Sequence, residues 1–197
     1  MNYPLYRPRA VPLLLFSALL LGDAAVTPAP LNRLVNGSFE SGSLAGWEPG
    51  NPELASVVSP GAPGGGDWAL QLQADWAPTL GFITQKIEGL QDGDIVELRA
   101  DVKAMNQEGG GAISLLVGNS PWSARGKLAA SSSETWTTLS VVDTLDLGPG
   151  DSVWVKLSSF HTEISPRVGR FDSASLSVLG PVPVAPVTWS GLKARYQ

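Results

Sequence analysis

The sequence predicts an all-β protein, an antiparallel β-sandwich, and three observations support that prediction. The 197 residues include 22 Gly and 16 Pro but only 16% charged residues, a composition typical of short strands joined by tight turns. From Val96 to Lys103, apolar and charged residues alternate strictly, as in a strand with one buried and one solvated face. Between residues 34 and 179, no segment shows the periodicity of an amphipathic helix.

The first 24 residues are predicted to be a secretory signal peptide. Arg7 and Arg9 precede an apolar run from Val11 to Leu21, and Gly22-Asp23-Ala24 supplies small residues for cleavage. The run is shorter than the about 20 residues of a comfortable membrane span, so an uncleaved anchor is the less favoured alternative. We therefore expect a secreted protein (extracellular, periplasmic or at the cell surface) without a transmembrane anchor after cleavage. Residues 25–32, which contain two Pro, are expected to be an unstructured lead.

Residues 33–180 are predicted to form the sandwich. Leu34 and Val35 are expected to be an edge strand that ends at a kink at Asn36-Gly37, a pair that readily takes positive φ. The further predicted strands are separated by Gly- and Pro-containing turns, as in β-sandwiches and barrels. They cover Leu54–Val58, Trp68–Ala74, Thr79–Ile87, Val96–Lys103, Ala112–Val117, Trp136–Val142, Ser152–Phe160 and Val168–Leu179.

Composition and motifs argue against several classes of function. The chain has no Cys, which excludes disulfides and thiolate metal sites. A net charge of −5 with a pI near 4.8 argues against a nucleic-acid partner. His161 is the only imidazole and no Gly-x-Ser-x-Gly elbow occurs, so a serine hydrolase is poorly supported. We predict that the protein is not an enzyme, although two carboxylates for glycoside hydrolysis need only meet in space.

Four motifs resemble carbohydrate-binding modules of families four and nine. Asn36-Gly37-Ser38-Phe39-Glu40, followed by Gly46-Trp47, is similar to the opening signature of those modules. Ile83 to Leu90 and Trp136 to Leu139 resemble two inner strands, and Phe171-Asp172-Ser173-Ala174 resembles the closing strand, with Ser173 and Ala174 replacing the Asp and Val of the family pattern. The resemblance implies a galactose-binding-like jelly roll that binds a polysaccharide or glycan.

The candidate carbohydrate-binding residues are exposed aromatic and planar polar side chains, because sugars offer flat C–H faces ringed by hydroxyl groups. Trp154 alternates out of phase with its apolar neighbours and is expected to face away from the core. Trp76 and Trp122 lie in Pro-containing loops that could rim a groove; for all three Trp, sugar binding and simple packing are equal alternatives. Trp47, Trp68 and Trp136 are predicted to be core residues. The weaker candidates for contacts with hydroxyl groups are Arg99, Gln85 and Gln73.

The function predicted from these residues is a secreted, non-catalytic carbohydrate-binding module that binds through exposed Trp residues. The alternative is a structural or adhesive cell-surface protein that uses the same sandwich without binding sugar, because such modules usually accompany a catalytic domain on one chain and none is seen here.

The family resemblance also implies one structural calcium ion. Its acidic ligands would be Glu40 and Asp172, with backbone carbonyls from the Gly66-Asp67 turn and from near Gly37. Calcium accepts six to eight hard oxygen ligands in loose geometry. The alternative is that both carboxylates are simply exposed or bonded to a neighbouring Arg, Arg33 or Arg170.

Residues 181–187 form a Pro-rich spacer before a short tail at residues 188–197. The tail can form a helix with Trp189, Leu192 and Tyr196 on one face, although so short a helix is marginal in water. Its alternatives are a frayed end that packs loosely on the sandwich or a tag for a docking or sorting partner.

Overall fold

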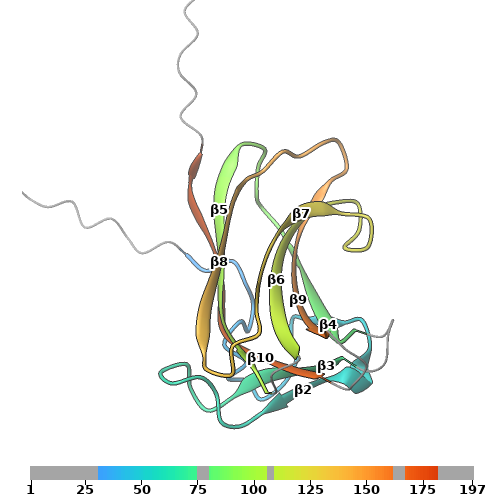
Figure 1. The fold of residues 1–197 in the computed structure, drawn as a ribbon. Helices are drawn as coiled ribbons and strands as arrows, with labels where there is room; N and C mark the ends of the chain where they lie inside the picture. The colour runs from blue at the N-terminus through green and yellow to red at the C-terminus, as the bar shows by residue number, and fades with distance from the viewer. Residues whose placement is uncertain (1–30, 75–79, 106–108, 162–166, 182–197) are drawn as a thin grey trace, which may run out of the picture.

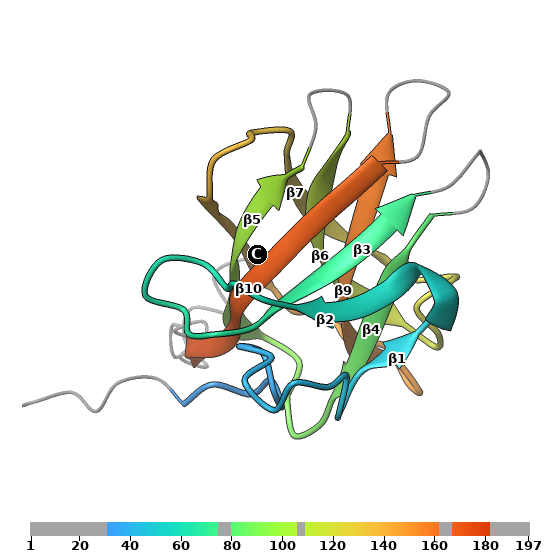
Figure 2. The ribbon, with the colours of Figure 1, turned by 90° about the horizontal axis from the view of Figure 1, so that it is seen from below.

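The computed structural model describes residues 31–74, 80–105, 109–161 and 167–181, which form two five-stranded antiparallel sheets packed face to face (Figures 1 and 2). The predicted signal peptide, the spacer from residue 182 and the C-terminal tail lie outside the described residues, as does Trp76. The described residues contain no helix both long and apolar enough to cross a membrane.

The first sheet, called sheet A, has the strand order β1-β4-β9-β6-β7. Its strands are β1 (Glu48–Pro49), β4 (Phe82–Ile87), β9 (Ser152–His161), β6 (Gly109–Gly118) and β7 (Arg125–Ser131). The second, sheet B, has the order β2-β3-β10-β5-β8. Its strands are β2 (Ala55–Val58), β3 (Ala69–Ala74), β10 (Arg167–Pro181), β5 (Asp94–Ala104) and β8 (Thr137–Thr144). A short 3-10 helix, η1 (Pro52–Leu54), precedes β2.

The predicted antiparallel sandwich is confirmed, and its connectivity is that of a jelly roll. Consecutive strands alternate between the sheets from β3 to β6 and again from β7 to β10, so most strands that follow each other along the chain lie in opposite layers. Figure 2 shows β2, β3, β10 and β5 in front of β4, β9 and β6.

The core lies between the two sheets and follows the alternation of the sequence. The inward residues of β5 are 0–1% exposed from Val96 to Val102, whereas Arg99 and Glu97 face solvent. The largest fully buried side chains, which come from both sheets and from the segment before β1, are Phe39, Phe171, Leu70, Leu72, Ile83, Leu98, Ile113, Leu115, Leu157 and Leu176. Burying each such side chain stabilises the fold by about 1.5–3 kcal/mol.

The predicted edge strand at Leu34 is wrong, because residues 31–46 form turns rather than a strand. Asn36 has a φ of 51° and Phe39 a φ of 59°, so the chain turns twice within four residues. The segment is nevertheless fixed to β10: Arg33 N–H donates to the Leu176 carbonyl (2.8 Å), and Ala174 N–H donates to the Gly37 carbonyl (2.9 Å). The kink at Asn36-Gly37 was predicted correctly, and it is the kink that prevents a strand.

The tryptophans predicted as core residues separate into three environments. Trp47 is buried (5% exposed) and packs on Phe39 with ring centroids 5.9 Å apart. Trp136 is half-buried. The prediction for Trp68 is wrong: the side chain is 38% exposed, because β3 begins one residue later and Trp68 belongs to the preceding turn.

Candidate functional site

The outer face of sheet A carries a continuous set of aromatic and polar side chains. In β4, Ile83 points into the core, so Phe82 and Thr84 point outward; in β9 the same alternation turns Trp154 and Lys156 outward. The register aligns Thr84 with Lys156, and Lys156 in turn with Ser114 of β6. The structure therefore agrees with the expectation that Trp154 faces away from the core.

Trp154 is hydrogen-bonded to the start of the loop that carries Trp122. Its indole Nε1–H donates to the carbonyl of Gly118, the last residue of β6 (3.3 Å). The chain then turns at residues 120–123, where Ser123 N–H donates to the Ser120 carbonyl (3.3 Å) and Pro121 occupies the turn position that proline favours. The turn places Trp122 above sheet A.

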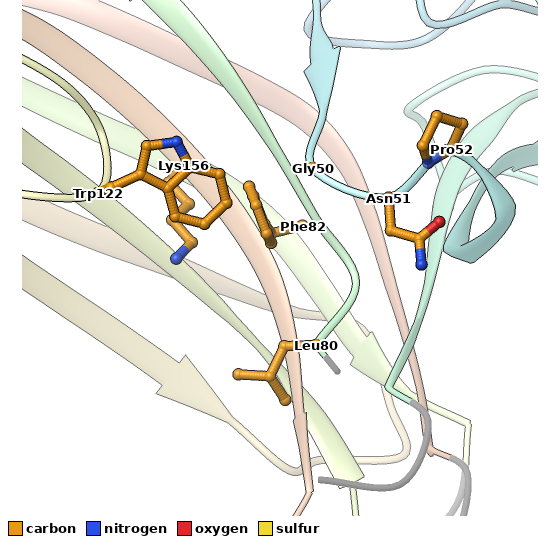
Figure 3. Close-up of a pocket in the computed structure, with 7 residues that line it drawn as sticks. All are labelled: Gly50, Asn51, Pro52, Leu80, Phe82, Trp122 and Lys156. Atoms are coloured by element: carbon orange, nitrogen blue, oxygen red, sulfur yellow. The ribbon is translucent and has the colours of Figure 1, made fainter. Parts of the chain in front are cut away.

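Trp122 and Phe82 form one wall of a pocket of about 430 Å³ (Figure 3). Their rings meet edge to face, with centroids 4.8 Å apart and an interplanar angle of 88°, a geometry worth about 0.5–1.5 kcal/mol. Trp122 is nonetheless 71% exposed. Most of this indole is thus available to a ligand while its position is defined by Phe82.

Lys156 supplies a cation to the same pocket. Its Nζ lies 4.6 Å from the centroid of the Phe82 ring, within the range of a cation–π contact. The side chain is half-buried, and this burial lowers the pKa of Lys156 because removal of water destabilises the ammonium form.

The opposite wall is formed by Gly50, Asn51 and Pro52, with Leu80 at one end (Figure 3). A Cβ on Gly50 would overlap the ring of Phe82, so only glycine allows the ring to lie there. Asn51 Oδ1 accepts the Glu53 N–H (3.1 Å) and so caps η1. Among the described residues, the Asn51 Nδ2 group has no hydrogen-bond partner and remains a donor for a ligand.

The pocket combines an exposed aromatic face with hydrogen-bond donors from Lys156 and Asn51. The described residues that line it include no carboxylate, imidazole or hydroxyl group. Stacking and hydrogen bonding are the interactions this set of side chains offers to a small polar molecule with an apolar face.

Of the predicted sugar-binding residues, Trp122 lines the pocket and Trp154 is bonded to the start of the loop that carries Trp122 without lining the pocket. The other described candidates lie elsewhere. Arg99 lies in β5 on sheet B, where its guanidinium is 3.7 Å from Glu97; Gln73 is exposed in β3 of the same sheet. Neither belongs to the face that carries the tryptophans, and Trp76 lies outside the described residues.

Gln85 belongs to the interior, which corrects its proposed role as a ligand contact. The side chain is 6% exposed. Its Oε1 accepts the Val35 N–H (2.8 Å), and its Nε2 donates to the carbonyls of Val35 (3.0 Å) and Gly46 (2.9 Å). The alternation in β4 points Gln85 inward with Ile83, and the amide fixes the irregular segment before β1 to sheet A.

Sequence reasoning did not single out Phe82, Lys156 or Asn51 as site residues. A signal existed for the first two, because Phe82 alternates with inward Ile83 and Lys156 with inward Val155. The contact of Phe82 with Trp122, 40 residues away, had no signal in the sequence because it depends on strand register.

The two carboxylates predicted to bind calcium accept hydrogen bonds from backbone N–H groups of the loop before β3. Glu40 accepts the N–H groups of Asp67 and Trp68 (both 3.0 Å), and Asp172 Oδ2 accepts the Ala62 N–H (2.7 Å). Asp172 is fully buried, and this burial raises its pKa above the ordinary value, with nearby Glu40 adding to the rise. Neither carboxylate is bonded to Arg33 or Arg170 within the described residues.

The oxygen atoms around this turn fit a hard cation. A Cβ on Gly61 would lie 2.8 Å from each of three oxygens, those of Asp172 Oδ2 and the carbonyls of Gly66 and Trp68. A Cβ on Gly66 would lie 2.5–2.6 Å from both Glu40 oxygens. The described residues contain no group of three His, Cys, Asp or Glu side chains suited to a metal, so an ion here would need these main-chain oxygens, which calcium accepts.

Solved structures with the same fold include carbohydrate-binding modules. A family 16 module shares 21% identity with this chain at a TM-score of 0.58, covering 74% of this chain and 99% of the module. A family 61 module in complex with β-1,4-galactotriose shares 16% identity at a TM-score of 0.55, covering 75% and 99%. A cyclase from Fischerella sp. TAU shares 14% identity at a TM-score of 0.55, covering 78% and 99%.

At these identities the comparison establishes the fold. No family model and no curated protein sequence matches the chain. The resemblance to families four and nine in particular therefore stays a prediction.

Proposed function

We propose that this protein is a secreted, non-catalytic carbohydrate-binding module that binds a polysaccharide or glycan through Trp122. The observation that carries the proposal is the pocket on sheet A, where a 71% exposed indole is fixed edge-on to Phe82 beside two hydrogen-bond donors. Secretion rests on the signal peptide predicted at residues 1–24.

Each part of the pocket has a role in this proposal. The apolar C–H face of a sugar ring stacks on the indole of Trp122, which loses little conformational freedom on binding. The hydroxyl groups at the ring edge accept hydrogen bonds from Lys156 Nζ and Asn51 Nδ2. Trp154 acts as a positioning residue, since its hydrogen bond to Gly118 holds the start of the loop that carries Trp122.

The fold comparison supports a sugar ligand without identifying it. Modules of two carbohydrate-binding families share the sandwich, and one of them was solved with β-1,4-galactotriose. For a single module we expect a Kd on the order of 10⁻⁵ to 10⁻³ M, which corresponds to about −4 to −7 kcal/mol.

The experiment is affinity electrophoresis of the protein through gels containing plant, algal and bacterial polysaccharides. At least one polysaccharide should retard the wild-type protein, and Trp122→Ala should remove most of that retardation without changing the melting temperature by more than a few degrees. Trp68→Ala is the matched control, because Trp68 is also partly exposed but lies in the turn before β3. Absence of retardation by every polysaccharide would overturn the proposal.

A structural calcium ion held by Glu40 and Asp172 is the second part of the proposal. The oxygens against Gly61 and Gly66 support it, because an ion there would neutralise two carboxylates and link the first and last segments of the sandwich. Glu40, Asp172 and the carbonyls of Gly66 and Trp68 would hold the ion.

Thermal melting in calcium and in chelator tests the ion site. Calcium at 100 times its Kd adds about 2.7 kcal/mol, or roughly 5–11 °C for a domain of this size. Glu40→Gln should abolish the calcium-dependent part of the shift, whereas the exposed Glu53→Gln should preserve it. An unchanged melting temperature after verified removal of calcium would refute the site.

A further inference from the structure

Lys156 is exceptional among the basic side chains of sheet A. Lys86 pairs with Glu88 (3.0 Å), Arg125 with Asp151 (3.3 Å) and Lys127 with Asp143 (2.6 Å). Lys156 has no such partner among the described residues, although it is half-buried and the protein carries a net charge of −5.

The described neighbours of Lys156 include no carboxylate in contact with it. The strand register places Glu48, Thr84, Lys156 and Ser114 in one row across the outer face of sheet A. Glu48 is two strands away, about 10 Å at ordinary strand spacing, and Thr84 lies between them. Among the described residues the immediate neighbours are thus two hydroxyl-bearing residues and the Phe82 ring, so the ammonium group has lost water without gaining a counter-ion from that part of the chain.

We infer that the pocket recognises an acidic sugar, a ring whose carboxylate or sulfate group binds Lys156 Nζ while its C–H face stacks on Trp122. This inference rests on the proposed function and names the class of ligand. A partly desolvated ammonium group is costly when unpaired and binds an anion strongly when paired. The burial that lowers the pKa of Lys156 is offset when an anion occupies the pocket.

Geometry favours an anionic group attached to a sugar over a free anion. Lys156 Nζ and the exposed indole of Trp122 both contact the Phe82 ring, so one ligand can meet the ammonium and the aromatic surface together (Figure 3). Lys156 is the only cation among the described residues that line the pocket, which fits one negative charge per bound sugar unit.

The test compares acidic polysaccharides with neutral forms of the same polymers. Polygalacturonate and alginate are paired with their carboxyl-reduced forms, and a sulfated galactan with its desulfated form, so that the carboxylate and the sulfate sources are distinguished. Affinities of the full chain are measured by affinity electrophoresis at two salt concentrations. The wild-type protein should bind at least one acidic polymer about 10- to 100-fold more tightly than its neutral form, the usual effect of a charged hydrogen bond.

Substitutions of Lys156 test whether its ammonium group causes the preference for acidic polymers. Lys156→Gln should lower the affinity for the acidic polymer to that for its neutral form, and Lys156→Arg should retain part of the preference. Lys86→Gln, on the same face but already paired with Glu88, should behave as the wild type.

The outcomes separate this inference from the proposed function. Binding with equal affinity for acidic and neutral polymers, or a preference that survives in Lys156→Gln, overturns the acidic-sugar inference and leaves carbohydrate binding intact. Failure to bind any polymer, acidic or neutral, overturns both.

Discussion

Replacing Gln85 by Leu should destabilise the sandwich and leave glycan binding intact. The side chain makes three hydrogen bonds to backbone groups of Val35 and Gly46, and these connect the irregular segment at residues 31–46 to β4. Leu occupies a similar volume, so the substitution removes the hydrogen bonds without opening a large cavity.

The expected loss follows from the number of hydrogen bonds. Three bonds at about 1 kcal/mol each give about 3 kcal/mol of unfolding free energy. For a domain of about 150 residues that loss corresponds to a fall in melting temperature of roughly 6–12 °C. Val35 is 61% exposed, so water reaches part of this region and the loss should not greatly exceed that value.

Urea unfolding followed by tryptophan fluorescence measures the change, and affinity electrophoresis measures binding in the same variant. Gln73→Leu is the control: Gln73 is exposed on sheet B, so its substitution should change stability by less than about 0.5 kcal/mol. The reasoning is refuted if Gln85→Leu alters the unfolding free energy by less than 1 kcal/mol while abolishing glycan binding, because Gln85 would then act on the ligand.

Two further predictions concern Gly50 and Asp172. Gly50→Ala should displace the Phe82 ring, lower glycan affinity at least tenfold and cost about 1–3 kcal/mol of stability; wild-type affinity in this variant would contradict the pocket geometry. In calcium-free buffer, the raised pKa of Asp172 means that the folded protein retains this proton more readily than the unfolded chain. Its contribution to stability is therefore largest below the unfolded pKa and is lost as pH rises through the folded pKa. The difference in unfolding free energy between wild type and Asp172→Asn should fall as pH rises above the ordinary Asp pKa of about 3.9, and a difference that rises with pH would disprove the assignment.

Most strands could be predicted from the sequence because burial of one face of a strand produces an alternation of apolar and polar residues. The alternation in β5 is the clearest case, and its inward residues are fully buried. β7 was not predicted from the sequence. It is an edge strand in which most residues are exposed, so its sequence shows no alternation of apolar and polar residues. The strand prediction at Leu34 and Val35 was wrong because the chain turns at Asn36 and Phe39; Leu34 is buried without belonging to a strand, and Val35 is 61% exposed.

Candidate site residues could be proposed from the sequence only where the sequence itself indicated that a side chain is exposed. Trp122 and Trp154 were identified because a loop and an outward strand position present large aromatic rings. Gln85 was misassigned because the residue type is compatible with sugar binding, whereas its inward position commits it to backbone groups. The role of Gly50 depends on a ring 32 residues away, and no local pattern reports such a contact.

The pairing of the first described segment with β10 has a mechanical consequence. The two run antiparallel, with Arg33 bonded to Leu176 and Gly37 to Ala174, so the chain enters and leaves at the same end of the pair (Figure 1). A force that pulls these ends apart loads the two contacts in succession, and hydrogen bonds of about 1 kcal/mol broken one at a time offer little resistance. Under tension Arg33 should therefore separate from β10 first, while the three Gln85 hydrogen bonds and the fully buried Phe39 hold the rest of the segment to the sandwich.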